Sequence, residues 1–259
     1  MFGPSLALAA PRGDGPTARR AVRSGLVRYG AGRGLFNGVA RLAAALALLL
    51  GLVAAAGPAQ AASDRPVILA LGDSLTAGYG LAQKDSFPAV LEQALAEAGR
   101  PARVINAGVS GDTSKGGRSR VGWLLTENPD LVLLELGSND GLRALDPAQT
   151  HANLAAIIEE AQAAGAHVLL AGMLAPPNLG RDYGEAFNAV FPRLAAEYDV
   201  TFYPFFLDGV AAEPSLNLGD GMHPNAEGVE VVVERILPTV LQALDRANEA
   251  ADRMEAAEG

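Results

Sequence analysis

Five short apolar runs that alternate with helical patterns constrain the fold of this 259-residue chain most strongly. The first, Val67–Leu71, is too short for an ordinary helix and stops at Gly72-Asp73-Ser74, which is typical of a buried parallel strand. We expect strands at 67–71, 103–108, 130–137, 167–171 and 200–203, and helices at 87–99, 118–127, 147–164, 183–198 and 225–248. This alternation predicts an α/β fold, a single three-layer α/β/α sandwich around a mainly parallel five-stranded sheet.

Residues 1–61 have the composition of an export signal. An arginine-rich region precedes the 15-residue apolar run Leu42–Ala56, and Gly57-Pro58 and Ala59-Gln60-Ala61 follow it. This order predicts a secretory signal peptide that is removed after Ala61. A membrane anchor is the alternative, but a membrane-spanning helix needs about 20 apolar residues. We therefore expect a periplasmic or secreted protein with one domain at 62–248 and a short acidic tail, 249–259, that frays.

The charge of the chain excludes several kinds of partner. The whole chain has 20 basic and 29 acidic side chains. Residues 1–62 hold 7 of the basic and 1 of the acidic ones, so the remainder has 13 against 28, a net charge of −15. Such a surface repels nucleic-acid phosphates and anionic membranes, so we expect neither nucleic-acid binding nor stable membrane insertion. Cysteine is absent, which excludes disulfides and thiol chemistry. A monomer is the default expectation.

Ser74 follows the first predicted strand, and ligands bind at the carboxyl ends of strands in open parallel sheets. Taken alone, Gly72-Asp73-Ser74 is better explained as a turn before a helix. The other end of the chain adds Asp220-Gly-Met-His223. A histidine can remove the proton of a serine hydroxyl, and an aspartate can hold its second ring nitrogen. Ser74, His223 and Asp220 are therefore the candidate nucleophile, base and orienting acid.

Attack of a serine on an acyl group creates an oxyanion, which requires hydrogen-bond donors. Two further predicted strands end at Gly108 and near Asn139. In a parallel sheet these strand ends share one edge with Ser74. The backbone N–H groups of Ser74 and Gly108 and the side-chain amide of Asn139 are therefore the candidate oxyanion donors.

Several other residues have simpler structural interpretations. We expect Asp73 to stabilise its turn, His151 to be a solvated surface residue and His167 to be a hydrogen-bonded structural histidine. Trp123 and Phe205–Phe206 are predicted to belong to the core. Neither of these two histidines has carboxylates or cysteines at metal-ligand spacing, so we expect no metal site and no cofactor.

Four sequence blocks resemble those of the SGNH or GDSL hydrolase family, in particular its bacterial periplasmic thioesterase, lysophospholipase and arylesterase members. The blocks are Gly72-Asp-Ser-Leu-Thr-Ala-Gly-Tyr79, Asn106-Ala-Gly-Val-Ser-Gly-Asp-Thr113, Glu135-Leu-Gly-Ser-Asn-Asp-Gly-Leu-Arg143 and Asp220-Gly-Met-His-Pro-Asn225. Ser138 departs from the pattern, which usually has glycine there. The resemblance spans about residues 66–244.

This resemblance implies a flavodoxin-like fold and assigns the same roles to the triad and to the three oxyanion donors. It also places one loop beside the acyl chain of the substrate, namely Leu174, Ala175, Pro176, Pro177, Asn178 and Leu179. We therefore expect an exported serine esterase and thioesterase that hydrolyses small acyl esters through an acyl-enzyme intermediate. Two alternatives stay open at this stage, an acyltransferase that uses the same site and a non-catalytic module that binds lipid or carbohydrate.

Overall fold

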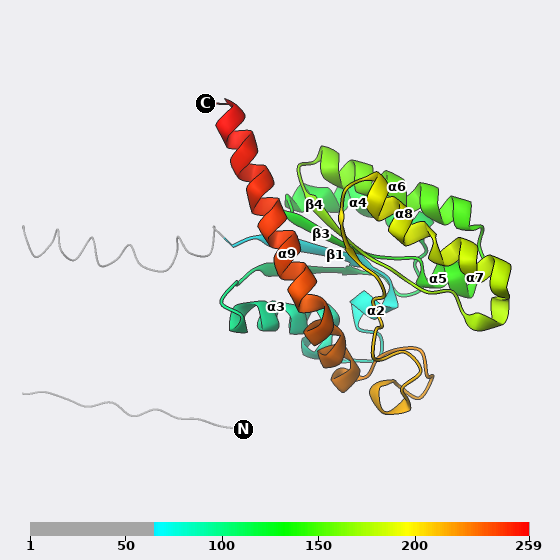
Figure 1. Cartoon of the computed structure of the whole chain (residues 1–259). Coiled ribbons are helices and arrows are strands. Elements are labelled where there is room, and N and C mark those ends of the chain that lie inside the picture. Colours follow the sequence, from blue (N-terminus) through cyan, green and yellow to red (C-terminus); the bar gives the residue numbers. More distant parts are fainter. Residues whose placement is uncertain (1–64, 259) are drawn as a thin grey trace, which may run out of the picture. The chain divides into compact units, whose positions relative to one another are not determined.

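The structure, a computed structural model, describes residues 65–258, so the expected export signal lies outside the described residues. A five-stranded sheet crosses the domain, and every neighbouring pair of strands in it is parallel. The strand order is β2-β1-β3-β4-β5 (Figure 1). The strands are β1 Val67–Gly72, β2 Arg103–Gly108, β3 Leu131–Glu135, β4 His167–Ala171 and β5 Thr201–Tyr203. The prediction of a parallel five-stranded α/β fold is confirmed.

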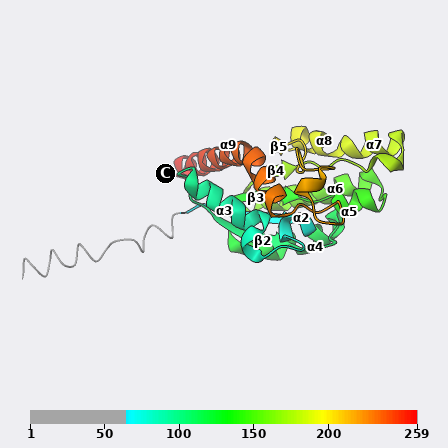
Figure 2. The ribbon, with the colours of Figure 1, turned by 90° about the horizontal axis from the view of Figure 1, so that it is seen from below.

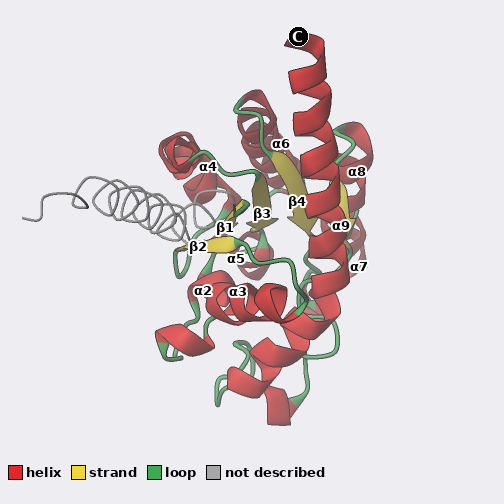
Figure 3. Cartoon of the chain, turned by 90° about the vertical axis from the view of Figure 1, so that its left-hand side faces the viewer, coloured by secondary structure: helices red, strands yellow, loops and turns green. Residues whose placement is uncertain are grey.

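Helices cover both faces of the sheet. One layer contains α3 (Phe87–Glu97) and α9 (Ala226–Glu258), which pack on each other (Figures 1 and 2). The opposite layer contains α4 (Ser114–Leu124), α6 (Pro147–Ala163) and α8 (Val190–Glu197). Figure 3 shows the yellow strands between these two red layers. The shorter helices are α2 Ser74–Ala77, α5 Ser138–Leu142 and α7 Arg181–Asn188, and the 3₁₀ turns are η2 Gln83–Asp85, η3 Leu125–Glu127, η4 Pro177–Leu179 and η5 Pro214–Leu216.

The central strands form the core because both of their faces are covered. All four residues Leu131–Leu134 of β3 are completely buried, as are Ile68–Leu71 of β1. Such continuous apolar runs suit a parallel sheet with helices on each side. Phe87 of α3 meets Phe206 edge to face, with ring centroids 4.9 Å apart. The core thus anchors the strand ends that carry the polar loops.

The strand order places a crevice next to Ser74. The chain passes from β1 to β2 on one side of the sheet and then returns to β3 on the other side of β1. In doubly wound sheets ligands bind outside the carboxyl ends of the strands at such a switch point. Here β1 leads into α2, which begins with Ser74, and β3 leads into α5, which contains Asn139.

The largest differences from the predicted element boundaries occur at three helical segments. Helix α4 begins at Ser114 because the Thr113 side chain caps it, accepting from the Gly116 N–H. The helix expected over 183–198 is divided into α7 and α8; Pro192, which lacks an N–H, lies just after the division. Helix α9 continues to Glu258, because the residues after 248 are mostly strong helix formers.

Trp123 was expected in the core and this is wrong, since 76% of its surface is exposed. The buried residues of α4 include Val121 and Leu124, three positions apart on one face. Trp123 is two residues from Val121, which turns it about 200° away from that position. Among residues 65–258, no helix has the length and apolar character needed to cross a bilayer.

Candidate active site

Ser74, His223 and Asp220 form a continuous chain of hydrogen bonds. Ser74 is the first residue of α2, and His223 lies in the segment that precedes α9. The Nε2 atom of His223 is 3.0 Å from the Oγ of Ser74, although 149 residues separate them in the sequence. The Nδ1 atom of His223 is 2.7 Å from Oδ2 of Asp220. This arrangement can carry a proton from the serine hydroxyl to the imidazole ring.

A tight turn holds Asp220 in its ionised form. Its Oδ1 accepts hydrogen bonds from the backbone N–H groups of Met222, at 2.9 Å, and His223, at 3.1 Å. The Met222 N–H, the His223 side chain and the His223 N–H together lower the pKa of Asp220 to about 2. The ring of Tyr79 lies against the ring of His223, with centroids 4.5 Å apart. The imidazole ring of His223 is therefore held at Nδ1 by Asp220 and contacted by the ring of Tyr79.

Two candidate oxyanion donors border the same space. As the first residue of α2, Ser74 has a backbone N–H that no helical carbonyl accepts. Asn139 Nδ2 donates one hydrogen bond to Oδ2 of Asp73, at 3.0 Å. An amide nitrogen carries two hydrogens, so a second donor is left at Nδ2. Asn139, Ser74 and His223 all line one cavity of about 290 Å³.

Gly108 lies beside this site but does not line the cavity. It pairs with Gly72 across β1 and β2, and its backbone packs against the peptide that joins Thr76 to Ala77. A Cβ at Gly108 would be 2.2 Å from the Ala77 nitrogen, so only glycine fits. The Gly108 N–H already donates to Oδ1 of Asn106, at 3.0 Å. Its predicted role therefore requires that this N–H be shared with the oxyanion.

A pair of buried carboxyl groups supports the turn that carries Ser74. Asp73 and Glu135 are both fully buried. Oε2 of Glu135 accepts from the Thr76 hydroxyl, at 2.7 Å, and from the Asp73 N–H, at 3.3 Å. Burial raises the pKa of Asp73 to about 6. Burial and then the neighbouring charge of Asp73 raise the pKa of Glu135 well above its ordinary value. Glu135 thus stays protonated to higher pH than an ordinary glutamate.

An apolar groove of about 370 Å³ continues from the cavity that Ser74, Asn139 and His223 line. The two spaces share Ser138, Leu142, Leu207 and Met222 among their lining residues. Four residues of the predicted substrate loop line the groove, Leu174, Ala175, Pro176 and Pro177. Asn178 and Leu179 belong to the 3₁₀ turn η4 and are not among its lining residues.

The opposite wall of the groove comes from a segment that the sequence analysis did not assign to the site. Phe205, Leu207, Ala211 and Ala212 follow β5 and line this wall. Phe205 was predicted to be core, but it is only partly buried because it faces the groove, whereas Phe206 is fully packed as expected. The available signal was the pair Phe205-Phe206 just after a predicted strand end, where ligands bind in parallel sheets.

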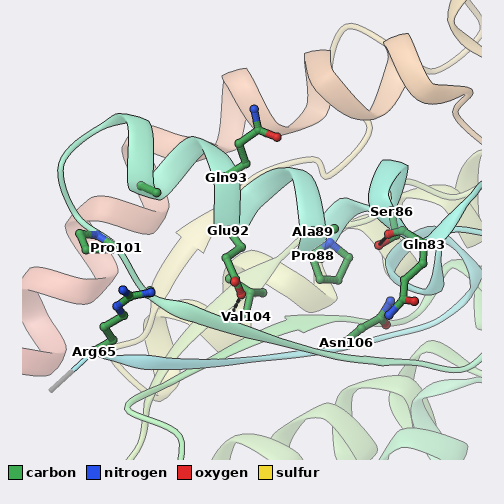
Figure 4. Close-up of a pocket in the computed structure, with 12 residues that line it drawn as sticks. Arg65, Gln83, Ser86, Pro88, Ala89, Glu92, Gln93, Pro101, Val104 and Asn106 are labelled. Carbon is green, nitrogen blue, oxygen red and sulfur yellow. Dashed lines mark hydrogen bonds between the residues drawn. The ribbon is translucent and has the colours of Figure 1, made fainter. Parts of the chain in front are cut away.

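A second hollow, of about 440 Å³, lies between α3 and the edge strand β2 (Figure 4). Its charged lining residues are Arg65 and Glu92. Glu92 points to the strand and its Oε2 accepts from the Val104 N–H, at 2.7 Å. Because the outward N–H groups of Val104 and Gly108 are both occupied by side chains, the edge of the sheet is protected against pairing with another strand.

The two other histidines lie away from the cavity. Nε2 of His167 is 2.8 Å from Oγ1 of Thr201, which agrees with the predicted structural role. His151 was expected to be solvated, but only 20% of its side chain is exposed, because it packs 3.3 Å from Oε2 of Glu197 on α8. In the described part of the chain, no group of three or more histidine and acidic side chains is arranged to hold a metal ion.

Comparisons with known proteins agree with this geometry. The model of the GDSL-like lipase/acylhydrolase family matches residues 70–231. The chain is 43% identical over 182 residues to esterase TesA of Pseudomonas aeruginosa, which covers 70% of this chain and 90% of that protein. It is 42% identical over 175 residues to thioesterase 1/protease 1/lysophospholipase L1 of Escherichia coli K12. This match covers 67% of this chain and 82% of that protein.

A solved structure also relates this chain to esterases. AlinE4, an esterase of the SGNH-hydrolase family, superposes with a TM-score of 0.59 at 48% identity, over 70% of this chain and 97% of that one. Since its relatives are enzymes, a non-catalytic binding module is not supported. The chain belongs to the GDSL or SGNH family of lipases and acylhydrolases and is an ester-bond hydrolase.

Proposed function

We propose that this protein is an exported serine esterase and thioesterase that cleaves acyl esters through an acyl-enzyme intermediate on Ser74. The position of His223 carries the proposal, because its ring reaches Ser74 Oγ with one nitrogen and Asp220 with the other. A histidine held in this way by an ionised carboxylate is suited to act as a general base.

The first half-reaction acylates the serine. His223 Nε2 takes the proton of Ser74 Oγ as this oxygen attacks the acyl carbon. The charge that develops on the carbonyl oxygen is stabilised by the Ser74 N–H and by the free hydrogen of Asn139 Nδ2, with the shared Gly108 N–H as a third donor. Asp220 stabilises the imidazolium ring. His223 then gives its proton to the departing alcohol or thiol, and the acyl group stays on Ser74.

The second half-reaction returns the free enzyme. A water molecule enters next to His223, loses a proton to Nε2 and attacks the acyl carbon. The same donors stabilise the second oxyanion. Its collapse releases the carboxylic acid, and the proton on His223 passes back to Ser74 Oγ.

The groove supports an acyl chain as the bound part of the substrate. Its walls are the loop segment Leu174–Pro177 and the segment Phe205–Ala212, and it opens directly from the catalytic cavity. Each methylene that leaves water contributes about 0.8 kcal/mol to binding. Both spaces are partly open to solvent, which suits a medium or long acyl chain, or an aryl ester, that stays partly exposed.

Export is proposed from residues 1–61, whose basic, apolar and Ala-Gln-Ala segments have the order of a signal peptide. The acyltransferase alternative uses the same residues, and a product analysis with an added acceptor alcohol separates it from hydrolysis. A transferase would form the new ester at the expense of the free acid.

The test of the proposed function uses the protein that begins at Ala62 and a series of p-nitrophenyl esters of increasing chain length. We expect turnover by the wild type and none by Ser74→Ala with an unchanged far-ultraviolet circular dichroism spectrum. Substantial turnover by Ser74→Ala would contradict the proposal.

A further inference from the structure

Asp73 directly precedes the proposed nucleophile, yet the hydrogen bonds of its side chain go to Leu75 and Asn139 and to no member of the triad in the described part of the chain. Its Oδ1 accepts from the Leu75 N–H, at 3.0 Å, and its Oδ2 accepts from Asn139 Nδ2, at 3.0 Å. The residue is fully buried. Asp73 therefore links the start of α2 after β1 to the start of α5 after β3.

We infer that Asp73 is a positioning residue that aims the Asn139 amide at the oxyanion. This inference rests on the proposed function, in which Asn139 is an oxyanion donor. Asp73 fixes one hydrogen of Nδ2, and the planar amide then directs the other hydrogen along a defined line. Without this acceptor, the side chain of Asn139 could rotate and its free donor would no longer be held in place before the reaction.

The chemistry of the two contacts explains why a carboxylate is required. Both partners of Asp73 are N–H donors, so both of its oxygens must accept. An asparagine at this position offers only one acceptor. It can cap α2 as well as aspartate does, by accepting from Leu75, but its amide nitrogen then faces the nitrogen of Asn139. The substitution Asp73→Asn thus keeps the cap and removes the contact with Asn139.

The surroundings hold Asp73 in this position. Oε2 of Glu135, from β3, accepts the Asp73 N–H and the Thr76 hydroxyl. The charged and titratable groups that act on Asp73 are Glu135, His223 and Asp112. Because burial excludes water, the hydrogen bond between Asp73 and Asn139 is stronger than it would be at the surface. With its pKa raised to about 6, Asp73 is still mainly ionised at neutral pH.

A double-mutant cycle tests the inference. Initial rates are measured for the wild type, Asp73→Asn, Asn139→Ala and the double variant, on one p-nitrophenyl ester. We expect Asp73→Asn to lower kcat about tenfold to a hundredfold with little change in KM, part of the loss caused by deleting a whole oxyanion donor. In the Asn139→Ala background, the same substitution should have almost no effect, because the group that it positions is gone.

Asp146→Asn is the matched control. Asp146 caps α6 by accepting from the Ala148 N–H, at 2.9 Å, and is not among the residues that line the cavity. The Asp146→Asn variant should keep the wild-type kcat, which would show that replacing a helix-capping aspartate by asparagine does not by itself lower the activity. Effects of Asp73→Asn that are equal in both backgrounds would overturn the positioning role.

Two outcomes separate this inference from the proposed function. If Asn139→Ala keeps the wild-type kcat, the oxyanion assignment fails and the positioning role fails with it. If Asn139→Ala loses kcat while Asp73→Asn does not, only the positioning role fails.

Nuclear magnetic resonance gives a second test that does not need a folded Asp73 variant. In Ser74→Ala protein labelled with ¹⁵N-asparagine, the Asn139 side-chain signals are assigned by their loss in the Asn139→Ala variant. We expect one Nδ2 hydrogen to be protected from exchange with solvent and the other to exchange freely. Equal exchange of the two hydrogens would refute the contact on which the inference depends.

Discussion

The buried carboxyl of Asp73 should give the stability of this protein an unusual dependence on pH. Burial raises its pKa from 3.8 to about 6. The folded protein therefore binds this proton more tightly than the unfolded chain does. Its contribution to the free energy of unfolding is largest at low pH and falls as the pH rises from 3.8 to about 6. An ordinary paired aspartate such as Asp220, whose pKa is lowered to about 2, behaves in the opposite way.

The size of this change in the free energy of unfolding follows from the binding of one proton to Asp73. Between about pH 5 and about pH 7, the Asp73 carboxyl changes from mainly protonated to mainly ionised in the folded state. In the unfolded chain it is ionised throughout. The linkage relation then gives a loss of about 1 kcal/mol in the free energy of unfolding over this interval.

Urea unfolding of the wild type and of Asp73→Asn at these two pH values measures the effect. His167, whose pKa is lowered by burial and by Arg246, contributes a term of opposite sign, but it is present in both proteins and cancels in the comparison. Glu135 does not cancel completely, because the charge of Asp73 raises its pKa, and the part that the variant loses has the same sign as the effect of Asp73. The wild type should lose about 1 kcal/mol more than the variant on going from pH 5 to pH 7. Equal changes in the two proteins would show that Asp73 does not carry a raised pKa.

Three further predictions concern activity and packing. Asp220→Asn should lower kcat about 10⁴-fold, because the amide no longer holds the required tautomer of His223; stopped-flow kinetics of ester cleavage measure this. Ala211→Phe should fill the groove and lower kcat/KM for a dodecanoyl ester about tenfold or more while sparing an acetyl ester, since each methylene left in water forfeits about 0.8 kcal/mol. Phe187→Ala should lower the free energy of unfolding by about 3–5 kcal/mol, measured in urea, because Phe187 is fully buried between Tyr183 and Phe191.

Much of the fold could be predicted because the signals are local. The run 167–171 is β4 with the same bounds, and the helix expected from Pro147 begins there because Asp146 caps it. The division of one predicted helix into two occurs where local signals conflict with each other. The helical pattern over 183–198 contains Pro192, whose missing N–H outweighs the apolar periodicity.

The candidate site was predictable to the extent that it lies at strand ends. Parallel topology alone brings Ser74 and Asn139 to one edge of the sheet, and the position of α9 adds His223. The contact of Asp73 with Asn139 could not be anticipated, because it depends on rotamers of two residues 66 positions apart. The wall formed by Phe205–Ala212 was missed for a similar reason, since a loop after β5 carries no periodic pattern.

The central claim is that Ser74 is the nucleophile, activated by His223. The most direct measurement is treatment of the protein that begins at Ala62 with a serine-reactive organophosphonate, followed by peptide mass spectrometry. We expect one adduct, on Ser74, whose formation parallels the loss of esterase activity and is strongly slowed in His223→Ala. An adduct on another residue with parallel loss of activity, or full activity after complete labelling of Ser74, would contradict it.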